Sequence, residues 1–374
     1  MDAQRNERKE NFKESMKQLA YPLIAILVSF IAGGILVAAF GNNPVVAYSA
    51  LIKGSLGDVG KVGETLVVTT YLILTGLSVA FAFRCGLFNI GAEGQFIIGT
   101  LVSLMVGYSF KGLPAIIHVP LTLALGALGG GIWGGIIGWL KARLGSHEVI
   151  NSIMMNYIAY NLCNYLTMKV FGVEGKAFSV EIADSAKLFR FSDLSPAFQF
   201  TRLSGGILLS LAAAFITYYL LNKTIRGYEV RAVGFNQYAA EYGGISVPKN
   251  VTFAMFYAGA LSGLAGAIMT SGMQYRVNYL MGFTGYGMDG IAVALVGNNH
   301  PIGVILSALL FGILQKGGPM MQIEGIAKEV VFIVQGILIL FVAAGFVKTI
   351  HDNMKAKKAA KLSREKLSVK GEGK

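Results

Sequence analysis

The chain has 374 residues, of which 54% are hydrophobic and only 14% are charged, and its mean hydropathy is +0.59. Soluble chains carry about 25% charged residues, so this composition excludes one large soluble core and predicts an integral membrane protein. The net charge of +12 is concentrated in the tails and in the loops of one face, so nucleic acid is not expected as a partner.

The sequence contains ten apolar segments, most of them near the length of about 20 residues that a helix needs to cross a bilayer. We therefore expect an all-α, polytopic membrane helical bundle with about ten transmembrane helices. The segments are 21–41, 65–83, 87–108, 115–140, 149–168, 203–221, 250–271, 284–297, 301–316 and 327–347. The eighth and ninth are short, so they either both span or form a re-entrant hairpin. The first lacks a clear signal-peptide cleavage site and is interpreted as an uncleaved span.

The distribution of Lys and Arg predicts the topology. With the N-terminus inside, alternating loops place most of these residues on the cytoplasmic side, and the two tails supply much of the excess. We expect a basic cytoplasmic N-tail at 1–20, a transmembrane domain at 21–347 and a basic cytoplasmic C-tail at 348–374. Loop 172–202 is then extracytoplasmic and loop 224–245 cytoplasmic.

A glycine-rich motif occurs twice. GLFNIGAEG at 86–94 aligns without gaps on GFTGYGMDG at 282–290, so that three glycines coincide and Glu93 matches Asp289. In the expected topology the two copies enter from opposite sides, as the halves of an inverted repeat do when they meet near the midplane. We therefore expect an inverted internal repeat, although a chain with 48 Gly can produce such a match by chance.

Polar side chains within apolar segments are candidates for a substrate pathway. A carboxylate at membrane depth costs at least a few kcal/mol unless it is paired or hydrated. Asn89 and Glu93 lie four residues apart, so on a helix they share a face, with Phe88 beside it. Such a surface suits a neutral, polar, ring-bearing solute. The alternative is a structural role, in which Glu93 pairs with another helix.

The fifth segment carries two adjoining polar and aromatic rows, which are Asn156, Tyr160 and Asn164, and Tyr157, Asn161 and Tyr165. This wide stripe should avoid lipid and face either the pathway or a neighbouring helix. The expected pathway residues are Phe88, Asn89, Glu93, Gln95, Asn156, Tyr160 and Asp289.

Motifs for catalysis are missing from the sequence. It has no phosphate-cradling G-x-x-x-x-G-K-[ST] loop, no metal-ligand spacing and no Ser/His/Asp constellation. We therefore expect neither an enzyme nor a bound metal.

The loop NKTIRGYEVRAVGFNQYAAEYGGISVPKN at 222–250 is too polar to span a membrane. Residues 228–241 predict a short helix, broken by Gly243 and Gly244 and then by Pro248. Its apolar side chains indicate either a docking surface for a partner or a solvated connector. They are Val230, Val233, Phe235, Tyr238, Ala239 and Ala240.

Three stretches of the chain resemble a known family. AVGFNQYAAEYGGI at 232–245 resembles the cytoplasmic coupling loop of ABC importer permeases in the branched-chain amino acid, ribose and nucleoside group. RCGLFNIGAEGQ at 84–95 and HEVINSIMMNYIA at 147–159 are similar to the nucleoside branch, with Cys85 where Ala is more usual. The resemblance spans most of residues 65–345.

The resemblance implies a permease subunit in a bacterial cell membrane, with both termini cytoplasmic, that carries nucleosides. It also implies a second, related permease, two cytoplasmic ATPases that bind ATP and Mg²⁺, and an extracytoplasmic binding lipoprotein; this chain itself binds no cofactor. The implied coupling residues are Arg231, Gly234, Asn236, Ala239, Ala240, Glu241, Gly244 and Ile245. Two alternatives stay open: a permease for sugars such as ribose, and a secondary transporter in which Glu93 and Asp289 relay ions.

Overall fold

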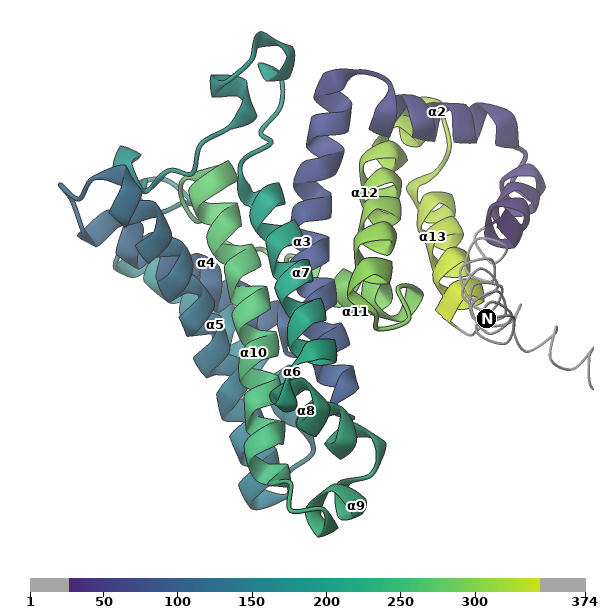
Figure 1. Ribbon diagram of the computed structural model, residues 1–374. Coiled ribbons are helices and arrows are strands. Elements are labelled where there is room, and N and C mark those ends of the chain that lie inside the picture. Colours follow the sequence, from purple (N-terminus) through teal and green to yellow (C-terminus); the bar gives the residue numbers. More distant parts are fainter. Residues whose placement is uncertain (1–26, 344–374) are drawn as a thin grey trace, which may run out of the picture. The chain divides into compact units, whose positions relative to one another are not determined.

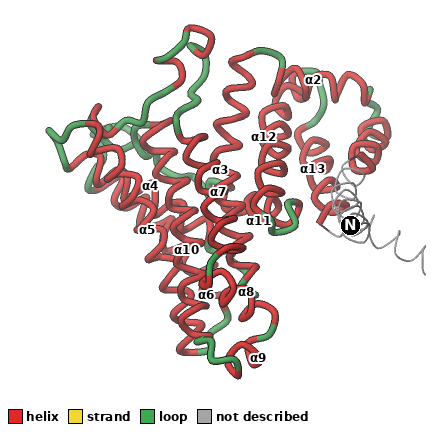
Figure 2. The backbone as a smooth tube through the Cα atoms, in the orientation of Figure 1, coloured by secondary structure: helices red, strands yellow, loops and turns green. Residues whose placement is uncertain are grey.

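The computed structural model describes residues 27–343. The predicted tails at 1–20 and 348–374, and the outer ends of the first and last apolar segments, lie outside these residues. Within residues 27–343 the regular structure is helical, and the only β pairing consists of isolated bridges in loops (Figure 2). The prediction of an all-α protein is therefore confirmed.

The described residues divide into two compact units, which are residues 27–48 together with 321–343, and residues 49–320. In chain order the elements are a helix at Leu27–Ala39, α2 (Pro44–Leu56), α3 (Val59–Arg84), α4 (Ala92–Ser109), α5 (Ala115–Leu144), α6 (Glu148–Lys169), the 3₁₀ turns η1 (Asp184–Ala186), η2 (Phe191–Asp193) and η3 (Pro196–Phe198), α7 (Gly206–Lys223), α8 (Ile225–Phe235), α9 (Gln237–Tyr242), α10 (Val247–Ile268), the π-helical turn η4 (Met269–Gln274), α11 (Tyr286–Val296), α12 (Pro301–Ile323) and α13 (Lys328–Ala343).

Five helical stretches in the described part of the chain are long and apolar enough to cross a membrane, namely α3, α5, α7, α10 with η4, and α12. A helix pair bent by 120°, Leu27–Ala39 with Pro44–Leu56, raises this to six if the pair counts as one span. The polar first turn of α4 and the Asn and Tyr residues of α6 lower the hydropathy of those two helices. The protein is thus a multi-pass membrane protein.

Helix α2 was not expected from the sequence. It follows a turn at Gly41 and begins at Pro44, a residue that is favoured in the first turn of a helix because its missing N–H has no partner there anyway. The eighth expected segment is the short helix α11, whereas the ninth extends from 301 to 323 and is long enough to span alone.

The larger unit is built around α10, which packs against α5, α4 and α3 (Figure 1). Helices α5 and α10 approach closely because Gly130 and Gly134 on one face Gly259 and Gly263 on the other. Small residues allow such close backbone contact in membranes, where packing and not water exclusion holds helices together. Helix α3 is buried along most of its length.

The two long loops lie at opposite ends of α3. Near its start, Glu64 accepts hydrogen bonds from the backbone N–H and the guanidinium of Arg202, and Gly60 lies beside Phe200. At its other end, the Arg84 carbonyl lies against Gly234, which belongs to α8. Loops 172–202 and 224–245 are therefore separated by the full length of this helix (Figure 1).

Candidate functional site

The first copy of the repeated motif interrupts the helices. After α3 ends at Arg84, Gly86 adopts φ +76°, and the chain runs back along α3 until the Asn89 amide donates to the Ser78 hydroxyl at 3.1 Å. Helix α4 begins only at Ala92. The expectation that Asn89 and Glu93 share a helix face is therefore wrong, because Asn89 precedes α4 and only Glu93 lies in it. The Asn89 amide instead forms hydrogen bonds with other side chains.

The second copy of the motif meets the first near the middle of α3. Residues 275–285 are non-helical, and α11 starts at Tyr286. A Cβ at Gly287 would overlap the backbone of Glu93, and one at Gly290 would overlap Thr75. From this meeting point α4 and α11 run in opposite directions. Helix α4 ends beside loop 172–202, where the Ala183 N–H donates to a carbonyl of α4 at 2.8 Å, and α11 ends near Arg84.

Glu93 joins the two copies. Its side chain is 0% exposed. One carboxylate oxygen accepts from the Thr284 hydroxyl at 2.6 Å and from the Gly285 N–H at 2.9 Å, and the other accepts from the Gly287 N–H at 2.7 Å. Glu93 also lies in the first turn of α4. Two helix N-termini, each with a partial positive charge, therefore face one carboxylate and stabilise it.

The neighbouring polar side chains are also bonded within the chain. The Asn89 and Gln95 amides exchange hydrogen bonds of 2.9 and 3.1 Å. Asn156 accepts from the Gly94 N–H at 2.8 Å and donates to the Ile90 carbonyl at 3.0 Å. The two Asn156 bonds satisfy backbone groups that the broken helix leaves free, as a membrane interior requires.

Two further expected residues have partners nearby. The Asp289 carboxylate accepts a hydrogen bond of 2.6 Å from the Gln315 amide. The ring of Phe88 stacks on that of Phe83, with centroids 5.2 Å apart.

The two rows of α6 differ in what they contact. In the first, the Tyr160 hydroxyl and the Asn164 amide both donate to the Leu280 carbonyl at 2.9 Å, so this row holds the non-helical segment 275–285. In the second row, Tyr157 is 53% exposed and Tyr165 is 62% exposed. The first row is thus turned inward and the second outward.

Loop 224–245 forms two helices and not the single helix that was expected at 228–241. Helix α8 ends at Phe235 and α9 begins at Gln237. The break is at Asn236, whose side-chain oxygen accepts from the N–H groups of Tyr238 and Ala239 at 3.0 and 3.1 Å. Asn is among the favoured N-cap residues, so it starts a new helix where the apolar pattern suggested a continuous one.

The apolar residues of this loop have two separate roles. Val230, Val233 and Ala240 are buried in the protein's own core, so these three do not contribute to an exposed docking surface. Phe235, Tyr238 and Tyr242 are 87%, 85% and 97% exposed. These three aromatic side chains lie in the segment that resembles a coupling loop, and they are called the coupling face after that resemblance. The remaining implied residues lie around it, Ala239, Glu241 and Gly244 exposed and Arg231 and Ile245 half-buried.

Gly234 connects this loop to the first motif copy. A Cβ at this position would overlap the Arg84 carbonyl, and the Gly86 backbone also lies in van der Waals range of Gly234. Two backbones in such close contact leave little freedom for relative sliding, because no flexible side chain lies between them.

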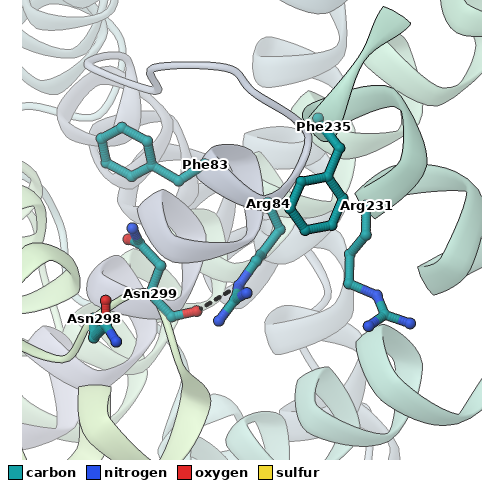
Figure 3. A pocket seen from close by; sticks show the side chains of 7 residues that line it. Phe83, Arg84, Arg231, Phe235, Asn298 and Asn299 are labelled. Carbon is teal, nitrogen blue, oxygen red and sulfur yellow. Dashed lines mark hydrogen bonds between the residues drawn. The ribbon is translucent and has the colours of Figure 1, made fainter. Parts of the chain in front are cut away.

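A pocket of about 260 Å³ opens beside this contact, lined by Phe83, Arg84, Arg231, Gly234, Phe235, Asn298 and Asn299 (Figure 3). The Arg84 Nε–H donates to the Asn299 carbonyl at 2.9 Å. Three loops that the alternating topology assigns to one side thus meet at one pocket. The sequence did not predict this pocket. The feature that could have indicated it is that Arg84, Arg231 and the Asn298–Asn299 pair all lie in loops that the expected topology assigns to the cytoplasmic side.

Comparison with known proteins decides the family. A family model described as the permease component of branched-chain amino acid transport systems matches residues 62–343. This chain belongs to that permease family. The match includes both motif copies and the coupling face, and it confirms the family resemblance seen in the sequence.

Several curated proteins are similar to this permease. The guanosine ABC transporter permease protein NupP of Bacillus subtilis is 46% identical over 332 residues, covering 88% of this chain and 94% of that protein. The nucleoside ABC transporter permease protein NupB of Lactococcus lactis is 36% identical, covering 94% and 98%. The glucose ABC transporter permease protein TsgB13 of Haloferax volcanii is 33% identical, covering 86% and 87%. No solved structure matches the chain.

More distant similarities come from the same organisms. The guanosine ABC transporter permease protein NupQ of B. subtilis is 27% identical over 68% of this permease, and the nucleoside ABC transporter permease protein NupC of L. lactis is 29% identical over 72%. In each of these two organisms, one permease of higher identity to this chain and one of lower identity are therefore named for the same type of transporter.

The permease shows no group of three or more His, Cys, Asp or Glu side chains that could hold a metal among residues 27–343. Cys85 and Cys163 are both buried and free.

Proposed function

We propose that this chain is the membrane-spanning permease subunit of an ATP-driven nucleoside importer. The observation that carries the proposal is its 46% identity to a guanosine permease along nearly the full length of both proteins. A permease of this kind is a transport subunit and not an enzyme, and the coupling face gives it a surface through which another protein can act.

The proposed complex has a division of labour. Two separate cytoplasmic ATPases bind ATP and Mg²⁺ and dock on the coupling face, and an extracytoplasmic lipoprotein delivers the solute. A second, related permease completes the pathway, as the paired names NupP and NupQ, and NupB and NupC, suggest. We place the complex in a bacterial cell membrane, with both termini of this chain in the cytoplasm.

The proposed topology has about ten crossings and an inverted repeat. The support for this topology is that the N-termini of α4 and α11 meet at Glu93, near the middle of α3, and that the two helices run from there in opposite directions. Discontinuous helices of this type mark the solute site in several transporter families. In this arrangement α11 is a half-helix that follows the non-helical segment 275–285.

The solute pathway is proposed to follow the outward row of α6 and segment 275–285. Non-helical backbone at membrane depth is tolerated only where protein covers it or water fills a cavity beside it. Phe283 in this segment contacts Tyr157 with ring centroids 5.2 Å apart, and Asn161 lies exposed on the same helix. Aromatic rings beside an amide suit a nucleobase, which stacks and forms hydrogen bonds.

In this proposal the buried pathway candidates, Asn89, Glu93, Gln95 and Asn156, hold the walls of the pathway in place. The ATPases push α8, and the Gly234 contact moves the turn that precedes Asn89. Switching of access then follows from rigid motion of the helices that meet at Glu93, because their contact tolerates little deformation.

Uptake measurements test the proposed function. The full importer in proteoliposomes, with ATP inside the compartment that faces the ATPases, is expected to accumulate radiolabelled guanosine. Glucose is the second candidate solute, favoured by the 33% identity to TsgB13. Accumulation of glucose without guanosine would replace the first proposal with the second. Guanosine uptake that needs an ion gradient and no ATPase would refute both and indicate a secondary transporter.

A further inference from the structure

The pocket beside the coupling face has a charge that the described chain leaves uncompensated. Arg84 and Arg231 both line it, and neither forms an ion pair with any carboxylate between residues 27 and 343. The acid nearest to Arg231 in sequence, Glu229, pairs instead with Arg226 at 3.3 Å and accepts from the Asn250 amide at 3.3 Å. Two like charges at one pocket repel each other unless an anion lies between them.

The arginines are only partly used as donors. Arg84 donates through Nε to the Asn299 carbonyl, and Arg231 donates through Nε to the Gly227 carbonyl at 3.4 Å within its own helix. In Figure 3 the Phe235 ring lies between the two arginine side chains, and both guanidinium groups extend past it. An arginine fork with free terminal N–H groups binds a carboxylate in a bidentate manner.

The surrounding residues favour an anion as well. The side-chain oxygen of Asn299 is buried with no hydrogen-bond partner in the described structure, and turning the amide over would present its NH₂ group to a bound anion. Burial, and then the nearby charge of Arg84, lower the pKa of His300, so this ring is mainly neutral at pH 7 and does not add a competing cation.

We propose that this pocket receives a carboxylate side chain, Asp or Glu, from the ATPase that docks on the coupling face. The inference rests on the proposed function, and it adds a specific charged contact to the aromatic one. Continuity of the two surfaces identifies the occupant, because Phe235 belongs both to the pocket and to the coupling face. The polar rim formed by Asn298 and Asn299 fits a protein side chain better than an acyl chain.

Charge reversal at Arg231 tests the contact. With the permease pair in nanodiscs, Arg231→Glu is expected to weaken ATPase binding at least about 30-fold. The substitution places two carboxylates of like charge against each other at the interface. The matched control is Arg226→Glu on the same helix, since Arg226 already has its partner in Glu229 and does not line the pocket. The control is expected to change binding less than about threefold.

Charge swapping in the full complex completes the test. One Asp or Glu of the ATPase, changed to Arg, is expected to restore binding to Arg231→Glu and to weaken binding to the unchanged permease. Equal binding by Arg231→Glu and the unchanged permease would overturn the proposal, as would an equal loss in both arginine variants or the lack of any restoring swap.

A lipid phosphate in the pocket is the competing occupant, and it would be recognised by normal ATPase binding combined with an Arg231-dependent requirement for anionic lipid. That outcome overturns the proposal. The proposed function fails in a different arm of the experiment, in which the unchanged permease neither binds an ATPase nor supports guanosine uptake.

Discussion

Two polar regions of this permease differ in how completely the chain itself supplies partners for their polar groups. At the junction of α4 and α11, the carboxylate of Glu93 has three donors from the chain itself, and Asn89, Gln95 and Asn156 have partners too. At the pocket beside α8, Arg84 and Arg231 have no counter-charge in the described chain.

The difference shows how a polar residue in an apolar protein can be interpreted. A buried polar group whose bonds are complete stabilises the fold, and removing it costs the unmet bonds of its partners. A partly buried charged group with no counter-charge in the chain is a candidate contact for another molecule. Substitution of a fully bonded group should therefore impair folding, whereas substitution of a group without a counter-charge should impair assembly or transport. Variants of both regions test this distinction.

Glu93→Leu is expected to have the largest effect. It leaves the Thr284 hydroxyl and the N–H groups of Gly285 and Gly287 unpaired, which should lower the free energy of unfolding by about 3 kcal/mol or more. The measurement is the yield of monodisperse permease by size-exclusion chromatography. Glu241→Leu, at an exposed acid on α9, is the control and should give a normal yield.

Glu93→Gln separates the structural role of this residue from solute contact. Its amide oxygen still accepts, so most of the yield should return. A normal yield for Glu93→Leu combined with altered choice among nucleosides would instead place Glu93 in the pathway and remove the contrast between the two regions.

Gly287→Ala is expected to have the next largest effect. Its Cβ would overlap the backbone of Glu93, which cannot turn aside as a side chain could, so the two motif copies must separate. Overpacking of this kind typically costs about 1–3 kcal/mol, and the thermal denaturation midpoint should fall. Gly282→Ala in the same motif is the matched control, because a Cβ there meets no atom within 4 Å. Equal midpoints in both variants would contradict the tight junction.

The sequence was sufficient for the class of fold and for the importance of these motifs, and insufficient for their geometry. Apolar segments of span length predict helices because the bilayer imposes both length and polarity. Asn89 was assigned to a helix because spacing alone does not reveal that Gly86 reverses the chain, a step that depends on tertiary contact with α3.

Burial was harder to predict than secondary structure. Val230 and Phe235 are both apolar residues of one short helix, yet the first is buried in the core and the second is exposed. Their orientation depends on how α8 packs against α7 and α10, which the sequence pattern of an 11-residue helix does not determine. The pocket was missed for a related reason, since its residues are far apart in the chain.

Ala239 and Ala240 sharpen the comparison within α9, because these adjacent residues differ in burial. Ala240 is buried and Ala239 is exposed. Ala240→Asp should reduce the yield of folded permease, since it buries an unpaired carboxylate. Ala239→Asp should leave the yield normal but reduce ATP-driven uptake by uncoupling the ATPase from the permease. The ratio of ATP hydrolysed to guanosine transported measures this uncoupling, and an unchanged ratio would remove α9 from the coupling contact.

The smallest effect is expected on α6, where the outward row can be compared with the exposed side of α7. The large exposed apolar residues that share α7 with Tyr219 are Leu208, Leu211, Phe215 and Ile216, a surface suited to lipid. Tyr157 on α6 instead lies beside Asn161 and Phe283. Tyr157→Leu should lower guanosine uptake about fivefold or more at normal yield, because stacking of a base on an aromatic ring contributes about 1–3 kcal/mol. Tyr219→Leu should leave uptake unchanged. If both variants transported equally well, the outward row of α6 would contact the second permease and not the solute, since lipid is a poor neighbour for its amide and phenol groups.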